Sequence, residues 1–337
     1  MDSYWTNKKI FVTGADGFIG SHLTETLVRN GAEIRALAFY NSLGSLGWLD
    51  KLSVKPGRDF EVLLGDIRDY GQMQSAVCGV DGVFHLASLI GIPYSYMAPR
   101  SYIDTNVSGC LNILQACQAA EVSNVVVTST SEVYGSAQYL PMDEMHPLSA
   151  QSPYAASKIG ADQLALSFQR SFDLPVKIIR PFNTYGPRQS ARAIIPTVIT
   201  QLLSGRKVRV GNLSSQRDFT YVSDTVAGLM AGMVSDAAVG QVINLGVGTN
   251  FSIGGTIDLI AEIMGIEVEV EQEIERIRPD KSEVDNLLSD NSQAKNILSW
   301  RPEYDGAGGF RRGLELTVGW LSDSSILEIY RPNSYAY

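Results

Sequence analysis

A glycine-rich turn near the start of the chain constrains its fold more than any other feature. The segment "VTGADGFIGSHL" places Gly14, Gly17 and Gly20 between a short apolar run and an amphipathic stretch that predicts a helix. Glycine there permits a tight turn and close approach of a pyrophosphate, and the helix N-terminus offers unpaired N–H groups. The turn therefore predicts a dinucleotide site. Its GxxGxxG spacing differs from the simpler GxGxxG fingerprint, so a purely structural turn is the alternative.

The first half of the chain alternates short apolar runs with longer amphipathic segments. The predicted strands are "KIFVTG", "EIRALAF", "EVLLGD", "GVFHLA", "NVVVTS" and "VKIIRP". The main predicted helices are "IGSHLTETLVRNG", "YIDTNVSGCLNILQACQAA" and "YAASKIGADQLALSFQRSF". This alternation predicts an α/β fold of the Rossmann type, with a doubly wound parallel sheet and helices on both faces. Residues 1–181 are expected to form the dinucleotide-binding domain.

The pattern changes after Pro181, where loops lengthen and short strands mix with helices. The predicted strands in this part are "KVRVG", "RDFTYV", "QVINLG" and "EVEVEQ". We interpret residues 182–321 as a smaller, mixed C-terminal portion that mainly binds substrate. A strand and a helix near residues 217–246 are expected to return to the main sheet. Residues 322–337 are expected to form an appended tail.

Composition argues against several classes of partner. The net charge of −9 and the pI near 4.9 disfavour nucleic acid and anionic membranes, because both require a broad basic face. The first residues show no signal-peptide pattern, and no apolar run is long enough to span a bilayer. Three cysteines form no CxxC pair and there are only three histidines, so no metal site is predicted. We expect a soluble, cytoplasmic protein.

The end of the second predicted strand lacks the acidic residue that commonly binds the cofactor ribose. Residues 38–41 are Ala, Phe, Tyr and Asn, and no arginine stands there to favour a 2′-phosphate. We therefore expect NAD, with NADP left open, and Asn41 and Ser42 as ribose contacts. Asp66, after the third strand, is placed to meet the adenine. A helix N-cap is the alternative role for Asp66.

Tyr154 and Lys158 lie four residues apart in "SPYAASK", which places them on one face of a predicted helix. An ammonium beside the phenol, together with a positive nicotinamide ring, is expected to lower the phenol pKa so that phenolate acts as a base near neutrality. This spacing is common by chance on helix surfaces. The combination of this spacing with the glycine turn and with Thr130 at an upstream strand end is not expected by chance.

The chain resembles the extended short-chain dehydrogenase/reductase superfamily and, within it, the nucleotide-sugar 4,6-dehydratases. The resemblance covers almost the whole chain and depends on "GADGFIG", "GDIRD", "HLAS", "TNVSGCLNILQA", "STSEVYG", "SPYAASK", "RPFNTYGPRQ", "RDFTYVSD" and "RIRPDKSEV". The most similar members are of the legionaminic-acid type, which act on nucleotide-linked N-acetylglucosamine. Beyond the residues above, the resemblance implies cofactor contacts from Phe18, Ile19, Ile67, Leu86, Ala87, Ser88 and Pro181.

The resemblance also implies roles for the stretch "STSEVYG". Thr130 would hydrogen-bond the sugar 4-hydroxyl, which Tyr154 deprotonates as hydride leaves C4. The ammonium of Lys158 would lie beside the phenol and the cofactor ribose. Glu132 would remove the C5 proton and assist loss of water from C6, after which hydride returns to C6. A capping role for Glu132 at the next turn is the alternative.

Ser131 departs from the Thr-Asp-Glu found in many dehydratases of this group, where the Asp is the acid for the departing hydroxyl. Serine is a poor acid because its pKa lies far above the operating pH. Either Glu132 carries the proton to the C6 oxygen itself and Ser131 only holds that oxygen, or the enzyme is not a dehydratase. The resemblance offers GDP-mannose dehydratases, with Thr-Ser-Glu, as precedent for the first interpretation.

A nucleotide sugar needs cations for its diphosphate and a border for its sugar ring. The expected substrate contacts are Tyr94, Tyr96, Asn183, Arg192, Arg217 and Arg278. Each arginine could instead form a surface ion pair, and the tyrosines could form a packed aromatic loop. The resemblance further implies a homodimer through a four-helix bundle formed by the helices of "YIDTNVSGCLNILQACQ" and "YAASKIGADQLALSF".

The leading interpretation is therefore 4,6-dehydration of a nucleotide-activated hexosamine, with GDP-N-acetylglucosamine or UDP-N-acetylglucosamine as the favoured substrate. A UDP-glucuronate decarboxylase is the nearest rival, because its site also has Ser-Glu after Thr. A 4-epimerase requires no base at C5 and would leave Glu132 without a role. A non-catalytic dinucleotide sensor would need the glycine turn but not Tyr154, Lys158 and Glu132 together. The sequence leaves the choice among GDP, UDP and dTDP open.

Overall fold

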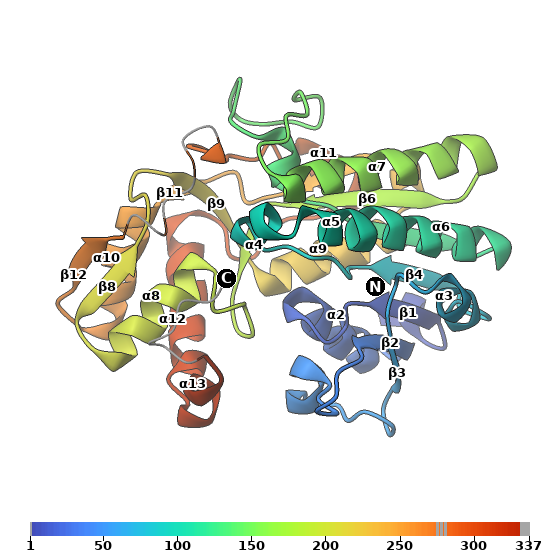
Figure 1. Cartoon of the computed structure of the whole chain (residues 1–337), viewed down its shortest axis with the longest axis horizontal. Coiled ribbons are helices and arrows are strands. Elements are labelled where there is room, and N and C mark those ends of the chain that lie inside the picture. The colour runs from blue at the N-terminus through green and yellow to red at the C-terminus, as the bar shows by residue number, and fades with distance from the viewer. Residues whose placement is uncertain (1, 274–275, 277–278, 280–281, 331–337) are drawn as a thin grey trace.

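A computed structural model describes residues 2–273, 276, 279 and 282–330 of the chain. Its centre is a seven-stranded parallel sheet with the order β10-β6-β5-β4-β1-β2-β3 (Figure 1). The strands are β1 (Lys9–Thr13), β2 (Glu33–Phe39), β3 (Glu61–Gly65), β4 (Gly82–His85), β5 (Asn124–Thr128), β6 (Val176–Pro181) and β10 (Val242–Leu245). The strand order reverses between β1 and β4, where doubly wound sheets bind their ligands. The predicted fold class is confirmed.

Helices cover both faces of this sheet because its strands are apolar on both sides. In β1, Ile10 and Val12 face one core and Phe11 faces the other, as the two-residue period of a strand requires. The first core includes α2 (Phe18–Arg29) and α9 (Val222–Val234). The second includes α3 (Tyr70–Ala76), α6 (Gly109–Ala119) and α7 (Pro153–Phe172).

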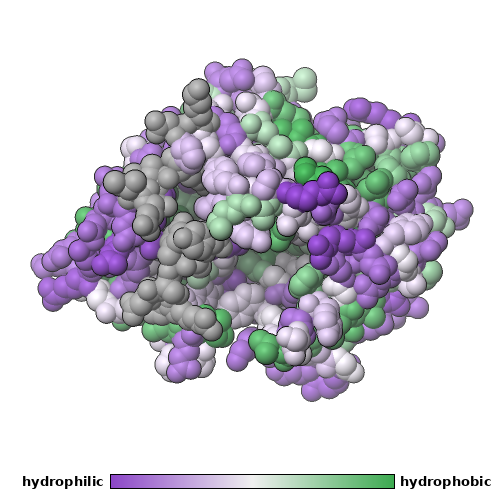
Figure 2. All heavy atoms as spheres, viewed as in Figure 1, coloured by the Kyte–Doolittle hydropathy of each residue, from purple (hydrophilic) through white to green (hydrophobic). Residues whose placement is uncertain are grey.

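A smaller portion follows β6 and lies at the left of Figure 1. It holds a three-stranded sheet of order β11-β9-β7 and a parallel pair of β8 and β12. Its elements are β7 (Asn183–Tyr185), β8 (Lys207–Val210), β9 (Gln216–Tyr221), β11 (Asn250–Ser252), β12 (Glu269–Gln272), α8 (Ile194–Ser204), α10 (Ile253–Met264) and α12 (Gly306–Leu321). Helix α11 (Ser292–Leu298) instead packs on α9 and β10 of the main part. Its outer edge is hydrophilic (Figure 2) and carries ion pairs such as Lys207–Glu271.

One predicted placement in this region is wrong. The strand of "RDFTYV", β9, pairs with β7 and β11 in the small sheet instead of returning to the main sheet. Helix α9 and strand β10 do return, α9 by packing against β5 and β6 and β10 by pairing with β6. The apolar pattern of a short strand does not state which sheet it joins, because either sheet buries it. The domain limits near residues 181 and 321 stay a prediction.

The predicted helix around residues 101–119 is interrupted. It consists of α5 (Pro99–Tyr102), the π-helical segment η2 (Ile103–Ser108) and α6. Within η2 the side chain of Asn106 bonds the loop after β4, accepting from Leu89 N (2.8 Å) and donating to Leu89 O (2.9 Å). Such π-helical turns are frequent at functional sites.

The last described residues, up to Tyr330, pack against the rest of the fold. Helix α13 (Ser324–Tyr330) packs on α12, and Tyr330 and Trp320 contact Trp48 in the 3-10 turn η1 (Gly47–Lys51). The Tyr330 hydroxyl donates to the Gln189 carbonyl at 2.6 Å. The other short elements are α1 (Asp2–Trp5), α4 (Ile92–Met97), η3 (Ser131–Tyr134) and η4 (Asp236–Ala238). Across the described part of the chain, every helix is too short or too polar to cross a bilayer.

Candidate active site

The glycine-rich turn forms a close contact between β1, α2 and the loop after β4. Gly14 has a φ of +67°, and a Cβ there would lie 2.8 Å from the backbone nitrogen of Ala87. A Cβ at Gly20 would lie 2.1 Å from the Gly14 oxygen. Gly17 is the N-cap of α2, so no side chain covers the first N–H groups of that helix. This geometry suits a dinucleotide pyrophosphate.

The other predicted cofactor contacts gather at the same edge of the sheet. Phe18 and Ile19 form the first turn of α2, and the remaining contacts directly follow or end β3, β4 and β6. They are Asp66, Ile67, Leu86, Ala87, Ser88 and Pro181. Because parallel strands place their carboxyl ends at one edge, the structure brings these residues together there.

A buried polar pair fixes β1 to the loop after β4. The Thr13 hydroxyl accepts from the N–H groups of Leu86 and Ala87, both at 3.1 Å, and lies 2.8 Å from Nδ1 of His85. Those two N–H groups occupy both acceptor positions of the hydroxyl, so its single proton is donated to Nδ1. Nδ1 therefore carries no proton, and His85 is neutral. Burial, followed by the charge of Lys158, lowers the His85 pKa to about 3. Sequence reasoning missed this pair.

Asp66 is held by its neighbour Arg68. The guanidinium contacts both carboxylate oxygens, with Nε at 3.0 and 2.9 Å, and these bonds lower the Asp66 pKa. The N-cap of α3 is Asp69, whose side chain accepts from Gln72 N at 3.0 Å. The alternative role of Asp66 as that cap is therefore wrong. Asp66 lines a shallow pocket together with Ser108 of η2. Contact of Asp66 with an adenine stays a prediction.

Asn41 shapes its own loop. Its amide donates to Phe39 O (3.3 Å) and Ser45 O (2.7 Å), and its carbonyl accepts from the N–H groups of Leu43 and Ser45. These contacts use every hydrogen-bonding position of the side chain. Ser42 beside it is exposed. Contact of either residue with a ribose stays a prediction.

Tyr154 and Thr130 meet at the start of α7. The helix begins with Pro153 in its first turn, and its N-cap Ser152 accepts from Ala155 N at 3.1 Å. This cap places the Tyr154 hydroxyl in a hydrogen bond with the Thr130 side chain. One turn further, Nζ of Lys158 donates to the Thr128 carbonyl at 2.7 Å. The predicted Tyr–Lys face therefore meets the end of β5.

The protein groups around Tyr154, without a nicotinamide ring, raise its pKa. Burial raises it, the Thr130 hydrogen bond lowers it, and the nearby charge of Glu132 raises it further. Lys158, whose own pKa burial lowers, donates to Thr128 O. The side chains alone thus keep the phenol protonated, and the expected lowering requires an added positive charge such as a nicotinamide ring.

Glu132 lies in η3, directly after the end of β5. The N-cap of this turn is Thr130, whose hydroxyl accepts from Glu132 N at 3.2 Å. A capping role for the Glu132 side chain is therefore wrong. The carboxylate is half-buried and close enough to Tyr154 to affect its pKa. Ser131, which precedes Glu132 in the sequence, is 3% exposed. The structure brings Thr130, Glu132 and Tyr154 together.

A buried ionic network supports this strand end. Asp162 of α7 accepts from Ser129 Oγ at 2.8 Å and from Nη2 of Arg180 at 2.8 Å. Arg180 also donates to the Tyr134 hydroxyl at 2.9 Å, and that hydroxyl donates to Asn244 Oδ1 at 2.8 Å. The network locks α7 to both ends of the segment that carries Glu132. No local motif in the sequence marks it, because its members are far apart along the chain.

An aromatic series leads from Tyr154 towards the surface. The ring of Tyr102 lies 6.3 Å from that of Tyr154 and 6.2 Å from that of Tyr94. The Tyr102 hydroxyl donates to the Gly91 carbonyl, and a Cβ at Gly91 would lie 2.1 Å from Nη1 of Arg192. The predicted residues Tyr94 and Arg192 thus come close to Tyr154 through Tyr102, which sequence reasoning missed.

The predicted diphosphate groups are already engaged or enclosed. Nη2 of Arg217 lies 3.3 Å from Glu283 and its Nη1 donates to Gln216 O at 2.9 Å. Asn183, at the start of β7, has a buried Oδ1 with no hydrogen-bond partner among the described residues. Tyr96 bonds Ser282 Oγ at 2.5 Å. Arg278 lies outside the described residues.

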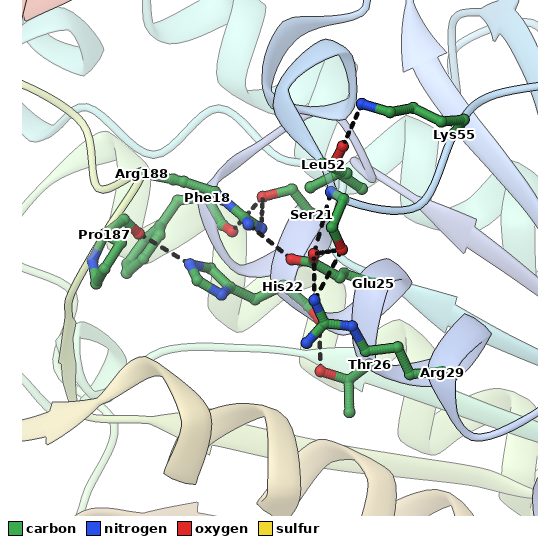
Figure 3. Close-up of polar contacts among 11 residues, drawn as sticks. Phe18, Ser21, His22, Glu25, Thr26, Arg29, Leu52, Lys55, Pro187 and Arg188 are labelled. Carbon is green, nitrogen blue, oxygen red and sulfur yellow. Dashed lines mark hydrogen bonds and ion pairs between the residues drawn. The ribbon is translucent and has the colours of Figure 1, made fainter. Parts of the chain in front are cut away.

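A second ionic cluster joins α2 to the loop after β7. Glu25 of α2 lies between Arg188, at 2.6 Å, and Arg29, at 3.0 Å (Figure 3). His22 contacts the carbonyl of Pro187 at 2.9 Å. Burial acts to raise the Glu25 pKa, but the bonds from Ser53 and Arg188 overcome it and lower the pKa to about 2. The helix of the cofactor turn is thereby fixed to the loop that leads to Arg192.

A glycine turn at a helix N-terminus and a Tyr–Lys pair beside a Thr-Ser-Glu strand end together define an extended short-chain dehydrogenase/reductase. The family model described as GDP-mannose 4,6 dehydratase matches residues 11–312. The chain belongs to this family. The predicted resemblance to nucleotide-sugar dehydratases of the extended superfamily is confirmed.

Curated relatives include both dehydratases and epimerases. The dTDP-glucose 4,6-dehydratase of Streptomyces antibioticus is 31% identical over 320 residues, covering 94% of this chain and 92% of that protein. The UDP-glucuronate 4-epimerase of Thermodesulfobacterium geofontis is 28% identical over 319 residues, covering 93% and 96%. Members of the family thus act on nucleotide sugars by dehydration or epimerisation.

Solved structures share the whole fold. DesIV, a dTDP-glucose 4,6-dehydratase from Streptomyces venezuelae with NAD bound, aligns with a TM-score of 0.84 and 28% identity over 94% of this chain and 97% of that chain. TunA, an NAD-dependent NDP-hexosamine 5,6-dehydratase involved in tunicamycin biosynthesis, gives 0.82 and 32% over 95% and 99%. The prediction of NAD as cofactor is confirmed at the level of the family.

Proposed function

We propose that this chain catalyses NAD-dependent 4,6-dehydration of a nucleotide-activated sugar, with GDP-N-acetylglucosamine or UDP-N-acetylglucosamine as the favoured substrate and a 4-keto-6-deoxy sugar as the product. The observation that carries the proposal is the half-buried carboxylate of Glu132 beside Tyr154, with Thr130 bonded to the phenol. Oxidation at C4 alone needs only the phenol. A neighbouring carboxylate suits a second proton transfer at C5.

Each residue has a defined proton to hold or move. Thr130 orients the sugar 4-hydroxyl and Tyr154 takes its proton, while Lys158 stabilises the phenolate. NAD held at the glycine turn would supply a hydride acceptor for C4 and a hydride donor for C6. Because the 4-ketone acidifies the C5 proton, Glu132 removes it and passes it to the C6 hydroxyl, which leaves as water. C5 then takes up a proton from solvent as C6 receives the hydride, and Tyr154 releases its proton to solvent. The sugar loses one water, and there is no net oxidation.

The proton for the C6 oxygen is best assigned to Glu132. Ser131 is buried and has a hydroxyl, which is a poor acid but a good hydrogen-bond donor. Glu132 receives a proton from C5 immediately before the C6 hydroxyl departs. A single carboxylate can therefore serve both steps, with Ser131 holding the C6 oxygen.

The substrate's diphosphate end is assigned to Asn183, Arg192 and Arg217, and its sugar is bordered by Tyr94 and Tyr96. Support comes from the buried, unpartnered oxygen of Asn183 and from the position of Arg192 beside Tyr102. Arg217 must exchange Glu283 for phosphate oxygens when substrate binds. Arg217 lies on β9 of the small sheet, and Glu283 lies in the segment that follows β12.

A 5,6-dehydratase is the second candidate, favoured by the likeness to TunA over 95% of the chain. Both reactions would use Glu132 in the same way and both remove one water. They differ in where the hydride returns: C6 gives a methyl group and a 4-ketone, whereas C4 leaves an alkene between C5 and C6. Decarboxylation of UDP-glucuronate, 4-epimerisation and non-catalytic dinucleotide sensing stay open as rival hypotheses.

Location and assembly stay predictions. A cytoplasmic homodimer would place α6 and α7, which pack side by side (Figure 1), against the same helices of a second copy. Ile103 of η2, which leads into α6, is 43% exposed, and Phe172 at the end of α7 is 52% exposed. Mass measurement of the purified chain in solution tests the dimer.

The deciding experiment incubates the purified chain with a panel of GDP-, UDP- and dTDP-linked sugars and NAD. Mass spectrometry should show a product lighter by one water from an N-acetylglucosamine nucleotide, and proton NMR should show a new methyl group at C6. An alkene signal without a methyl group would replace the assignment by 5,6-dehydration. Release of CO2 from UDP-glucuronate with no dehydrated hexose would overturn both.

A further inference from the structure

The carboxylate missing from the end of β2 has a counterpart in the glycine-rich turn. Asp16 lies between Gly14 and Gly17, and its Oδ2 accepts from Phe39 N, the last residue of β2, at 3.1 Å. An acidic group thus stands at the strand end although no acidic residue occurs at positions 38–41. This carboxylate belongs to the turn that follows β1 and not to β2 itself.

Asp16 is held in place by its backbone. Its carbonyl accepts from Trp48 N at 3.0 Å, and a Cβ at Gly47 would lie 2.7 Å from that carbonyl. Gly47 has a φ of +59°, which a side chain rarely adopts, so this contact is built into η1. The carboxylate position is therefore fixed from both β2 and η1.

One oxygen of this carboxylate is available to a ligand. Within the described part of the chain, the Asp16 carboxylate bonds only the N–H groups of Phe39 and of Asp16 itself, and it forms no ion pair with a lysine or arginine. Two carboxylate oxygens offer more acceptor positions than these two bonds use, so one stays open to a ligand. Burial raises the Asp16 pKa, as expected for a half-buried carboxylate that lacks a cation. The neighbouring candidate, Asn41, uses all its hydrogen-bonding positions within its own loop.

We propose that Asp16 takes the place of the strand-end acid: Oδ1 accepts a hydrogen bond from a hydroxyl of the adenosine ribose, and the charge of Asp16 rejects a 2′-phosphate. The ribose next to the pyrophosphate lies between the glycine turn and the end of β2 in this class of sheet. Asp16 is the described carboxylate that touches both. It therefore sets the choice of NAD over NADP.

This inference rests on the cofactor part of the proposed function and on no step of the sugar chemistry. The test is calorimetric titration of the full chain, freed of bound nucleotide, with NADH and with NADPH in the absence of sugar. Wild type should bind NADH at least about tenfold more tightly, which corresponds to one charge-assisted hydrogen bond. Equal affinities in wild type would overturn the proposal without any variant.

The variant Asp16→Asn keeps an acceptor for Phe39 N but removes the charge. It should reduce the preference for NADH about tenfold, mostly by improving NADPH binding. Asp50→Asn is the matched control, because the Asp50 carboxylate also caps a backbone N–H, that of Leu46 at 2.9 Å, in the adjacent turn. Asp50→Asn should leave the preference unchanged.

The outcomes separate this inference from the proposed reaction. If Asp16→Asn weakens both dinucleotides equally, Asp16 only stabilises the turn and the inference is wrong. If wild type binds neither dinucleotide, the cofactor assignment fails together with it. If NADH is preferred through Asp16 but no sugar is dehydrated, the inference stands and the proposed reaction falls.

Discussion

The reaction side and the diphosphate side of the candidate site are built in contrasting ways. Around Tyr154 the supporting polar groups bond to backbone or to one another inside the core, as with Lys158 and Thr128 O or Asp162 and Arg180. On the diphosphate side, Arg217 is paired with a partly buried carboxylate and Asn183 has an oxygen without a partner in the described structure. The first arrangement is preorganised, whereas under the proposed function the second exchanges partners when a nucleotide sugar binds.

This difference indicates where rate and where affinity are determined. Groups that are rigidly placed before binding contribute mainly to the chemical step. Groups that exchange one ionic partner for another contribute mainly to substrate affinity and specificity. Variants on the two sides should therefore change different kinetic constants.

The largest expected effect is on the reaction side. Tyr154→Phe removes the hydroxyl that takes the C4 proton, so kcat should fall by about 10²–10⁴-fold while the chain stays folded. A continuous assay of sugar dehydration measures it. Tyr139→Phe is the matched control, since its exposed hydroxyl bonds only Asp143 at 2.6 Å in the described structure. Equal activities of the two variants would remove Tyr154 from the mechanism.

The next effect is on the diphosphate side. Arg217→Ala should raise KM for the nucleotide sugar about 10–100-fold with little change in kcat, because a charge-assisted contact to phosphate is lost. Arg209→Ala, on an exposed arginine paired with Glu271 and Glu273, should leave KM unchanged. Steady-state kinetics at several substrate concentrations measure both.

Glu283→Gln sharpens that test. If Arg217 exchanges partners on binding, removing the competing carboxylate should lower KM, opposite in sign to Arg217→Ala. If the pair is only structural, both substitutions should lower stability and leave KM alone, and Arg217 would not bind the diphosphate.

The ionic cluster around Glu25, which joins α2 to the loop after β7, should contribute to stability. Arg188→Ala leaves the buried Glu25 with one cation fewer, and the free energy of unfolding should fall by about 2–3 kcal/mol. Arg29→Ala, which removes a 61% exposed partner of the same carboxylate, should cost about 0.5 kcal/mol. Denaturant titration compares them. Equal losses would mean that burial of the Arg188 contact adds nothing.

The last effect concerns the dependence of stability on pH. The pKa of His22 is lowered to about 4 and that of His85 to about 3, mainly by burial, against an ordinary value of 6.5. Between these values the unfolded chain binds more protons than the folded chain, so stability is lost as pH falls below 6.5. Each histidine contributes about 1.4 kcal/mol per pH unit in its window.

Unfolding measured at about pH 7 and about pH 5 should show this loss. His22→Gln should reduce the dependence on pH by roughly half, because His85 still titrates. An unchanged dependence in that variant would mean that His22 titrates normally in the folded chain.

The sequence alone predicts what depends on local pattern. The strands "EIRALAF" and "VKIIRP" match β2 and β6 residue for residue, because apolar β-branched runs bounded by turns leave little choice of conformation. The meeting of Thr130 and Tyr154 was also predictable, since a strand end and a helix start at the same sheet edge must lie close. The pairing of β9 with the small sheet could not be predicted in this way.

Contacts between distant segments account for the rest. Asp162 with Arg180, Glu25 with Arg188, and Asp16 with Phe39 each join residues whose pairing no local motif encodes. The pKa of Tyr154 shows the same limit: the expected lowering by Lys158 together with a nicotinamide ring takes no account of burial, which raises the pKa in the protein alone. Burial is a property of the assembled core and not of the helix.

The most direct test of the account is the fate of the C5 proton in Glu132→Gln. With wild type in deuterated water, dehydration should place deuterium at C5 of the product. The variant should still reduce the bound cofactor on adding substrate, seen as absorbance of the reduced nicotinamide, but it should neither exchange C5 nor release water. Ser131→Ala should retain exchange. If Glu132→Gln exchanged the C5 proton and dehydrated the sugar as fast as wild type does, the role of this carboxylate and the proposed reaction would both be contradicted.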